Sequence, residues 1–398
     1  MLLTTPEQVE RVAAAVIEAG AFAVDLEFVP ESRYVPELAL VQLAWGPHCA
    51  PRTAVIDPLE VDPGPVLRLV GDEGVETIAH AAQADLGLLI ASFGVSVRRL
   101  HDTQIGAAFV GMGDQASYGT LVERVLGVEL RKGSQFTDWL RRPLSSEQLQ
   151  YALDDVRYLP ALWHTLRRRL LARGRLRWVT EESEFLARRA DRRPEPREAY
   201  LRVKGSSRMR RRSVGALRAI AEWRELEARR TNRPPARVLA DRSMIELARA
   251  IPEDEAGLLS VRGVSSSLVR HHGAAMLRSL QEGAADPPPP EPRVTRSDLR
   301  VEVSAAALQS LVRARAQTAD IASRFVATRE DIEHIARWWL LGNLDQEPDV
   351  PLLQGWRREL VGRDALSWLA GESSIVADPN DPAGLRLEPR GEAAPRNA

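Results

Sequence analysis

The stretch AVDLEFV, residues 23–29, decides the fold of the first part of this chain. Asp25 and Glu27 alternate in it with apolar residues, which is the pattern of a β-strand. Alternate side chains of a strand lie on one face, so both carboxylates should point to the same side of a sheet. Charges inside an apolar strand cost free energy, which indicates that these two carboxylates have a function.

Two further segments supply acids on predicted helices. QYALDDVRYL, residues 150–159, has helical periodicity, so Tyr151 and Asp155 should share one helix face. TIAHAAQADLGLLI, residues 77–90, predicts a strand followed by a short helix that carries Asp85. Each pattern alone is more typical of a solvated strand edge or helix surface. In this order, however, four acids and a phenol from separate elements are what a two-metal phosphodiester hydrolase requires.

The chemistry of such a site explains these residue types. Magnesium takes hard oxygen ligands, usually a few carboxylates together with water and substrate phosphate. Several carboxylates packed together repel one another unless cations neutralise them. Two ions roughly 4 Å apart hold the attacking and leaving oxygens of an in-line displacement. A tyrosine on the same helix face as a ligand can hold the attacking water in line.

Several segments together resemble the ribonuclease D family, which are 3′→5′ exoribonucleases of the DEDD superfamily with tyrosine in the last motif. The resemblance covers roughly residues 1–372 and rests on the C-terminal modules and on AFAVDLEFVPESRYVPELALVQLA (21–44), HAAQADLGLL (80–89), LHDTQIGAAFVG (100–111) and FTDWLRRPLSSEQLQYALDDVRYL (136–159). It implies that Asp25 and Glu27 form the first exonuclease motif, Asp85 the second, and Tyr151 with Asp155 the third. It further implies that the four acids hold two divalent metal ions, Mg²⁺ or Mn²⁺, and that the tyrosine orients the nucleophilic water.

The family resemblance also implies an RNA partner, with trimming of the 3′ ends of tRNA precursors or other structured RNA. A related 3′→5′ DNA exonuclease would share the same catalytic residues, and a non-catalytic RNA-binding scaffold is a third alternative. The helical C-terminal modules favour RNA, and the five intact motif positions disfavour the scaffold. No obligate protein partner is evident.

Length and composition agree with a large enzyme. The 398 residues are enough for two or three domains, and 44% of them are hydrophobic. The single cysteine, Cys49, excludes an internal disulfide and indicates a reducing compartment. No stretch approaches the length of an apolar membrane span, and the N-terminus lacks the basic region of a signal peptide. We therefore expect a cytoplasmic protein without a membrane partner.

The formal net charge of −1 hides a division along the chain. Residues 1–150 hold 11 Lys and Arg against 20 Asp and Glu, whereas residues 151–398 hold 43 against 35. An acidic catalytic part suits metal ions and a basic remainder suits phosphates. Two basic clusters are therefore candidate RNA contacts, although solvated surfaces explain them equally well. The candidates are Arg167, Arg168, Arg169, Lys204, Arg208, Arg210, Arg211 and Arg212.

The predicted organisation is an α/β domain followed by two all-α domains. Short strands alternate with helices up to about residue 180, and the resemblance implies a ribonuclease-H-like fold, a mixed sheet flanked by helices. The later segments resemble the helicase-and-RNase-D C-terminal (HRDC) domain, a small helical bundle. The predicted domains are 1–180 (exonuclease), 181–205 (connector), 206–284 (first HRDC), 285–297 (proline-rich linker), 298–372 (second, diverged HRDC-like) and 373–398 (disordered tail).

The second helical domain is predicted from a weak internal repeat. VLADRSMIEL (238–247) and FVATREDIEH (325–334) align at an offset of 87 residues, with Asp241 matched to Thr328. Both residues are good helix N-caps, so two generic capped helices could produce the same match.

Three polar residues near the motifs are expected to be structural. Asp154 adjoins Asp155 but points about 100° away around the helix, so it should be solvated. Asp102 fits a helix N-cap better than a metal ligand. His80 should hydrogen-bond within the fold.

Overall fold

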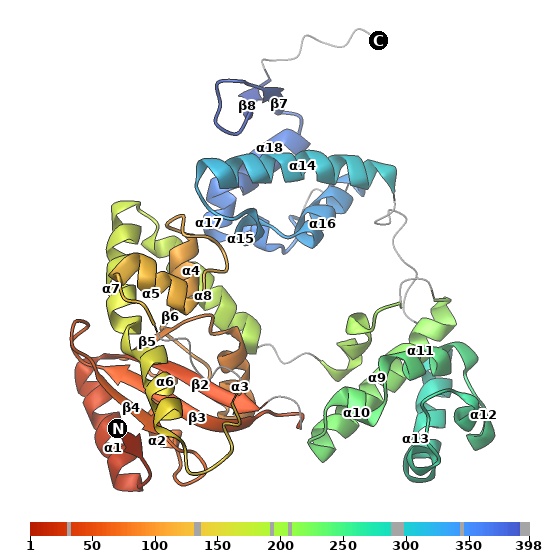
Figure 1. Ribbon diagram of the computed structural model, residues 1–398. Coiled ribbons are helices and arrows are strands. Elements are labelled where there is room, and N and C mark those ends of the chain that lie inside the picture. The colour runs from red at the N-terminus through yellow and green to blue at the C-terminus, as the bar shows by residue number, and fades with distance from the viewer. Residues whose placement is uncertain are drawn as a thin grey trace.

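The computed structural model describes residues 1–29, 33–130, 137–191, 195–205, 209–287, 298–342 and 346–390. They form three bodies, which we call the N-terminal domain (1–191), the first bundle (195–287) and the second bundle (298–369) (Figure 1). None of the described helices combines the length and the apolar character that crossing a membrane requires.

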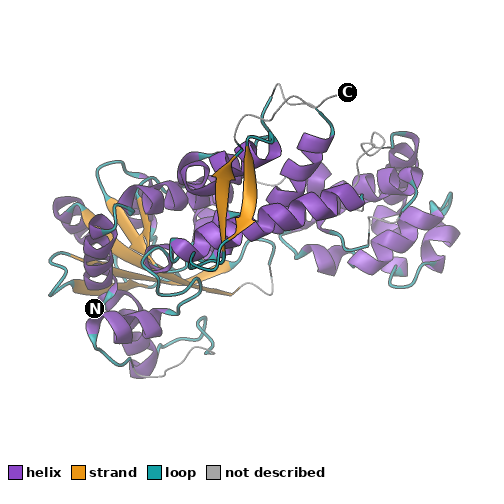
Figure 2. Cartoon of the chain, turned by 90° about the horizontal axis from the view of Figure 1, so that it is seen from above, coloured by secondary structure: helices purple, strands orange, loops and turns teal. Residues whose placement is uncertain are grey.

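The N-terminal domain is built on a mixed six-stranded sheet in the order β1-β4-β3-β2-β5-β6. Strands β2, β3 and β4 pair antiparallel, whereas β5 pairs parallel to both β2 and β6, and β1 pairs parallel to β4. Helices lie on both sides of this sheet (Figure 2). The predicted fold class, a mixed sheet flanked by helices, is confirmed. The strands are β1 (Leu2–Leu3), β2 (Ala21–Val29), β3 (Glu37–Trp45), β4 (Arg52–Ile56), β5 (Glu76–Ala79) and β6 (Leu100–Asp102).

Alternation along β2 assigns each of its side chains to one face of the sheet. Phe22, Val24 and Leu26 are buried in a core shared with the first and third helices. Ala23 is buried on the opposite face with residues of the sixth and seventh helices, and Asp25 and Glu27 share that face. The helices are α1 (Pro6–Ala19), α2 (Gly64–Leu67), α3 (Gln83–Phe93), α4 (Thr103–Ala108), α5 (Tyr118–Leu126), α6 (Ser146–Arg157), α7 (Leu159–Ala172) and α8 (Leu176–Asp191), with a 3₁₀ turn η1 (Arg68–Gly71).

The predicted domain boundary at residue 180 is wrong, because it falls inside α8. Val179 and Ser183 are both buried, and the helix continues to Asp191 against α3 and β6. The expected connector, 181–205, is therefore mostly structured. Its later part, the 3₁₀ helix η2 (Pro196–Arg202), packs with Ala199 into the first bundle.

The first bundle encloses its own apolar core. Helices α9 and α13 cross closely, since a Cβ added at Gly215 would lie 2.1 Å from the carbonyl oxygen of Gly283. Several contacts join this bundle to the N-terminal domain: the backbone N–H of Tyr34 donates to the carbonyl of Asn232 (3.2 Å), and the backbone N–H of Val35 donates to Oδ1 of Asn232 (3.0 Å). The helices are α9 (Arg211–Thr231), α10 (Pro235–Val238), α11 (Asp241–Ala250), α12 (Glu255–Ser260) and α13 (Ser266–Ala285).

The second bundle shares a hydrophobic core with the N-terminal domain. The Trp356 ring packs edge-on against Phe109 at 4.9 Å between centroids, and Arg357 donates from Nη2 to buried Glu182 at 2.5 Å. The second bundle therefore packs directly against the N-terminal domain. It comprises α14 (Leu299–Thr318), α15 (Ser323–Val326), α16 (Arg329–Leu340), η4 (Pro351–Leu353), α17 (Gly355–Arg357), the π-helical turn η5 (Arg358–Gly362) and α18 (Arg363–Leu369).

The two bundles match locally at an offset of 88 residues, not the predicted 87. Helix α9 begins at Arg211 and α14 at Leu299, and each is followed by a left-handed residue, Asn232 (φ 49°) and Asp320 (φ 51°). The predicted alignment slipped by one position because it matched helix-capping residues, whereas the buried faces set the true register. The matched buried residues of α11 and α16 are Met244 with Ile332, Leu247 with Ile335, and Ala248 with Ala336.

The C-terminal segment contains ordered structure that was not predicted. Residues 373–398 were expected to be disordered, but β7 (Ser373–Ala377) and β8 (Leu385–Pro389) pair antiparallel. Ile375 and Leu387 are partly buried against the second bundle, which explains why the hairpin is ordered. Residues 391–398 and most of the proline-rich linker, 288–297, lie outside the described residues.

Candidate active site

Three of the predicted acids converge in the structure. Asp25 and Glu27 on β2 and Asp155 on α6 each offer a carboxylate oxygen, and these oxygens lie within 4.8 Å of one another. All three side chains are partly buried. The strand and helix faces predicted from the sequence therefore do face each other.

Helix α6 is placed by the segment that leads into it and by its apolar face. Ser145 caps it by accepting from the backbone N–H of Gln148, and Arg142 just before it is held by Asp57 (2.8 Å). Ala152 and Val156 are fully buried against the sheet. Asp155, adjacent to Val156, is thereby turned toward the carboxylates of β2.

Asp85 lies in the first turn of α3, close to the three converging acids but outside their tight group. The turn before α3 is fixed by Asp102, whose carboxylate accepts from the backbone N–H groups of Ala81 (3.1 Å) and Ala82 (2.9 Å). Ala81 adopts a left-handed backbone conformation in this turn (φ 54°). The fixed turn therefore sets the direction of α3 and places Asp85 near the other acids. Asp102 also accepts from Gln104 N as the N-cap of α4, which confirms its predicted capping role.

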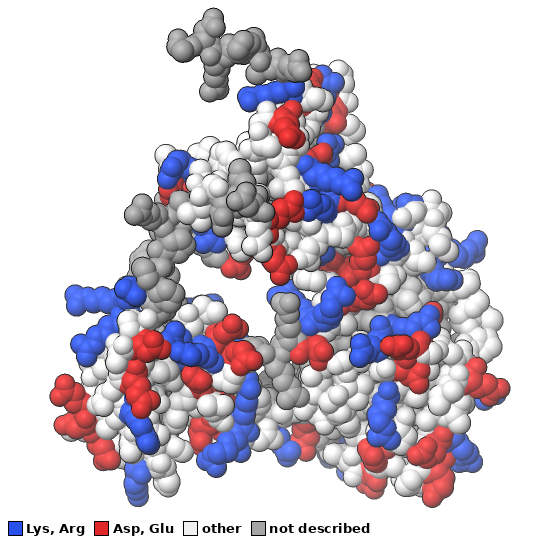
Figure 3. All heavy atoms as spheres, turned by 180° about the vertical axis from the view of Figure 1, so that it is seen from behind, with Lys and Arg blue, Asp and Glu red and all other residues white. Residues whose placement is uncertain are grey.

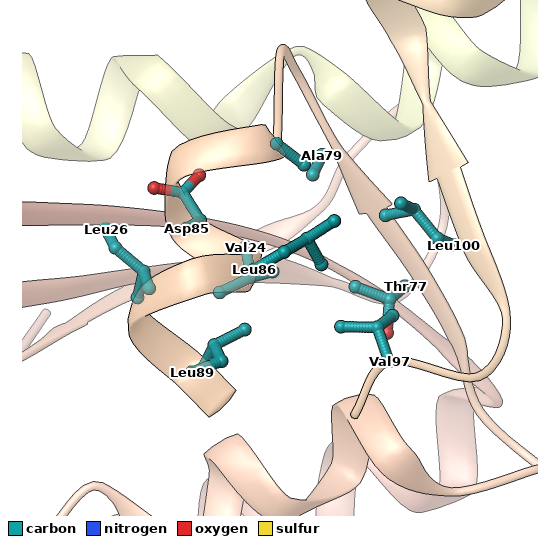
Figure 4. A pocket seen from close by; sticks show the side chains of 10 residues that line it. Val24, Leu26, Thr77, Ala79, Asp85, Leu86, Leu89, Val97 and Leu100 are labelled. Atoms are coloured by element: carbon teal, nitrogen blue, oxygen red, sulfur yellow. The ribbon is translucent and has the colours of Figure 1, made fainter. Parts of the chain in front are cut away.

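Below Asp85 lies a small, mostly apolar cavity between β2, β5 and α3 (Figure 4). Its lining includes Val24, Leu26, Leu86 and Leu89. The Asp85 carboxylate points away from these side chains (Figure 4). The apolar face of α3 therefore anchors the helix, while its acid stays outside the core.

Burial and mutual repulsion raise the pKa values of the four acids. Burial raises the pKa of Asp25 to about 7, and burial together with the Asp25 charge raises that of Glu27 to about 8. The pKa of Asp155 is raised to about 8 by burial and then by Asp25 and Glu27. Burial and the charge of Asp25 also raise the pKa of Asp85 well above its ordinary value. The causes of these shifts among the described residues are burial and neighbouring acids rather than a basic group.

Tyr151 stands beside this cluster on α6, one helical turn before Asp155. Burial raises the pKa of its phenol, as do the nearby charges of Asp155 and Glu27. A hydrogen bond between Tyr151 and Asp155 accompanies these effects. The hydroxyl is therefore neutral and able to donate or accept a hydrogen bond at the edge of the acids. Its ring lies 6.0 Å from that of buried Trp139.

Two further polar residues lie at this site and were not predicted from the sequence. The hydroxyl of partly buried Tyr118 on α5 donates to the backbone carbonyl of Asp154 and accepts from the N–H of Tyr158. No local pattern marks Tyr118. Gln42 on β3 is completely buried opposite Asp25, and the isolated glutamine in the apolar run LALVQLAW was a usable signal.

The remaining predicted neighbours are structural. The Nδ1 atom of His80 lies 3.0 Å from the hydroxyl of Thr103, which confirms a hydrogen bond within the fold. Asp154 accepts from Gln150 Nε2 (2.9 Å) and pairs with Arg157 (3.3 Å) on the outer side of α6.

The candidate RNA-binding residues fall on two separate helices. Arg167, Arg168 and Arg169 are exposed on α7. Lys204 is exposed shortly before α9. A second group of exposed arginines lies at the N-terminal end of α9, and Arg208 lies outside the described residues. That second group is Arg210, Arg211 and Arg212. Elsewhere basic and acidic side chains intermix, as one face shows (Figure 3).

Comparison with known proteins extends over nearly the whole chain. Residues 2–171 match the 3′-5′ exonuclease family model, and residues 213–280 match that of the HRDC domain. Ribonuclease D of Granulibacter bethesdensis is 36% identical over 384 residues, covering 95% of this chain and 94% of that protein. Ribonuclease D of Acidiphilium cryptum is 37% identical over 383 residues, covering 95% of each.

A solved structure from Escherichia coli is similar over nearly the whole chain. The crystal structure of Escherichia coli RNase D, described as an exoribonuclease involved in structured RNA processing, superposes with a TM-score of 0.82. The two are 29% identical, and the match covers 93% of this chain and 98% of that one.

Proposed function

This chain belongs to the ribonuclease D family of hydrolytic 3′-5′ exoribonucleases, and from that premise we propose that it trims the 3′ ends of tRNA precursors or other structured RNA. The observation that carries the proposal is the convergence of Asp25, Glu27 and Asp155, with Asp85 beside them. The relative solved from Escherichia coli acts in structured RNA processing, which supports this substrate class.

In this proposal Asp25, Glu27, Asp85 and Asp155 hold two divalent cations, Mg²⁺ or Mn²⁺. The donor set fits, because carboxylate oxygens are the hard ligands that these ions prefer. The raised pKa values fit as well, since buried acids that repel one another gain from binding a cation. Bound there, two such ions would polarise the attacking and leaving oxygens of a phosphodiester.

The protein's own part in the reaction is positioning. Tyr151, tied to Asp155, offers a neutral hydroxyl that can hold the attacking water in line with the scissile phosphate. The ring stays in place because buried Trp139 lies beside it. Tyr118 fixes the end of α6 and with it the orientation of Asp155.

RNA binding is proposed for the arginines at the start of α9. Arg210 is its N-cap and Arg211 and Arg212 are its first two residues, where cations oppose the positive end of the helix dipole. Phosphate groups at this end would offset that repulsion, and arginine binds phosphate bidentately. Arg167, Arg168 and Arg169 of α7 and Lys204 belong to the same proposal, as expected from the charge pattern.

The second bundle is proposed to be a diverged HRDC-like domain, because its helices repeat those of the first at a constant offset. It cannot be removed without exposing the apolar residues of the N-terminal domain that it covers. Point variants therefore test its role better than truncation.

The only cysteine, exposed Cys49, forms no internal disulfide, which supports our expectation of a reducing, cytoplasmic setting.

A DNA exonuclease is the second candidate, because the acids alone do not select the sugar. The test is release of 3′ nucleotides from matched single-stranded RNA and DNA and from a 3′-extended tRNA. We expect metal-dependent release from RNA, abolished by a chelator. Preference for DNA, or release that persists in the chelator, would contradict the proposal.

A further inference from the structure

Gln42 is a buried polar residue in an otherwise apolar setting. It is 0% exposed, and neither its Oε1 nor its Nε2 has a hydrogen-bond partner among the described protein atoms. Buried amides almost always have a partner, because an unpaired one costs free energy. Its partner must therefore be a water molecule or a group whose position changes when the site is filled.

The strand register places this amide next to the catalytic acids. In the antiparallel pair of β2 and β3, Gln42 lies directly opposite Asp25. Residues directly opposite in such a pair carry their side chains on the same face, with Cβ atoms about 4.5–5.5 Å apart. Gln42 is thus within reach of the Asp25 carboxylate, directly or through one water.

Helix α6 packs on the face of the sheet that carries Gln42. Leu40, two residues before Gln42, is buried in a cluster with Ala152 of α6. Ala44, two residues after it, is buried in a cluster with Val156. Gln42 therefore lies beneath the turn of α6 that carries Asp155, on the floor of the acidic cluster.

We propose that Gln42 is a positioning residue, whose amide N–H groups orient the Asp25 carboxylate for a divalent cation. The inference rests on the proposed metal site. An amide suits this task, because it donates hydrogen bonds without a charge. A lysine or arginine there would instead compete with the cation for the carboxylate.

The test compares Gln42→Met, which keeps the length of the side chain but not the amide, with the unsubstituted full-length chain. Mn²⁺ binding is measured by calorimetry without RNA. We expect Gln42→Met to bind Mn²⁺ roughly 10-fold more weakly, as is typical when a partner of a metal ligand is lost. On RNA, kcat should fall while KM stays the same.

Thr77→Val is the matched control. Thr77 is also a buried polar residue of this sheet without a partner for its hydroxyl, but it faces the apolar cavity. It lies apart from the Asp85 carboxylate (Figure 4). This variant should bind Mn²⁺ as the unsubstituted chain does.

Unchanged Mn²⁺ affinity and kcat in Gln42→Met would overturn the inference and leave Gln42 as a core residue. Gln42→Leu, a smaller apolar replacement, must show the same loss of Mn²⁺ affinity. If both variants fail to fold, the amide is needed for folding itself, and the inference is also overturned. If the unsubstituted chain binds no Mn²⁺, the proposed metal site fails together with this inference.

Discussion

Tyr118 on α5 holds the backbone of Asp154 on α6: its hydroxyl donates to the Asp154 carbonyl at 2.9 Å. The same oxygen accepts from the N–H of Tyr158 at 3.2 Å, so it bridges the junction of α6 and α7. The next residue after Asp154 is the proposed ligand Asp155. The Tyr118 phenol thus holds in place the end of α6 that carries Asp155.

Tyr118→Phe should therefore loosen Asp155 without removing a ligand. We expect kcat to fall roughly 10-fold, the lower end of losses at partners of metal ligands, with little change in KM. Tyr200→Phe in the first bundle is the control and should leave kcat unchanged. Equal kcat for the Tyr118 variant and its parent would show that the end of α6 needs no such support.

Tyr151→Phe separates chemistry from binding. The ring would still pack beside Trp139, but the hydroxyl bonded to Asp155 is lost. We expect kcat to fall more than KM rises, because the attacking water is less well oriented. Steady-state kinetics on a short unstructured RNA would measure both, and a change in KM alone would make Tyr151 a binding residue.

The raised pKa values predict how stability depends on pH. Asp25, Glu27 and Asp155 have folded-state pKa values of about 7, 8 and 8, above those of carboxyls in the unfolded chain. Their protonation therefore stabilises the metal-free fold at low pH, and this stability is lost as pH rises through 7 to 8.

Thermal melts in a chelator should show Tm falling between about pH 4 and 8, from the carboxyl pKa values of the unfolded chain to those of the folded chain. Mn²⁺ should raise Tm most at the alkaline end, because protons no longer compete for the carboxylates. Glu27→Gln should flatten the profile. A metal-free Tm that rises across this window would refute the electrostatic description of the site.

The arginines of α9 give a prediction about salt. Arg210→Ala with Arg212→Ala should weaken binding of a folded tRNA and reduce its salt slope by about 1 per lost phosphate contact. The control replaces Arg230 and Arg242, which already pair with Glu227 and Glu246. Filter binding at several salt concentrations measures both. Equal slopes for the two double variants would mark the α9 cluster as a solvated surface.

Local patterns predicted the parts of the fold that local physics determines. Period-two alternation identified β2 and the shared face of its acids, and a four-residue spacing identified the face of α6. Capping chemistry at Asp102 was also readable, because an N-cap depends on its immediate neighbours.

Features set by long-range packing could not be predicted in this way. Burial of Val179 carries α8 past the predicted boundary, and contact with the second bundle orders the hairpin of β7 and β8. The position of Gln42 opposite Asp25 depends on strand register, and the contact of Tyr118 with α6 depends on tertiary structure. No spacing in the sequence specifies either arrangement.

The rate at which Asp25→Asn releases 3′ nucleotides from a 3′-extended tRNA at saturating Mg²⁺ tests the central claim most directly. The substitution keeps the shape of the side chain but removes a charge that the two cations require. We predict a loss of at least ~10³-fold relative to the unsubstituted chain, comparable to the loss of a positioned electrostatic group. A near-normal, metal-dependent rate would contradict the assignment of Asp25, Glu27, Asp85 and Asp155 as the metal-binding acids.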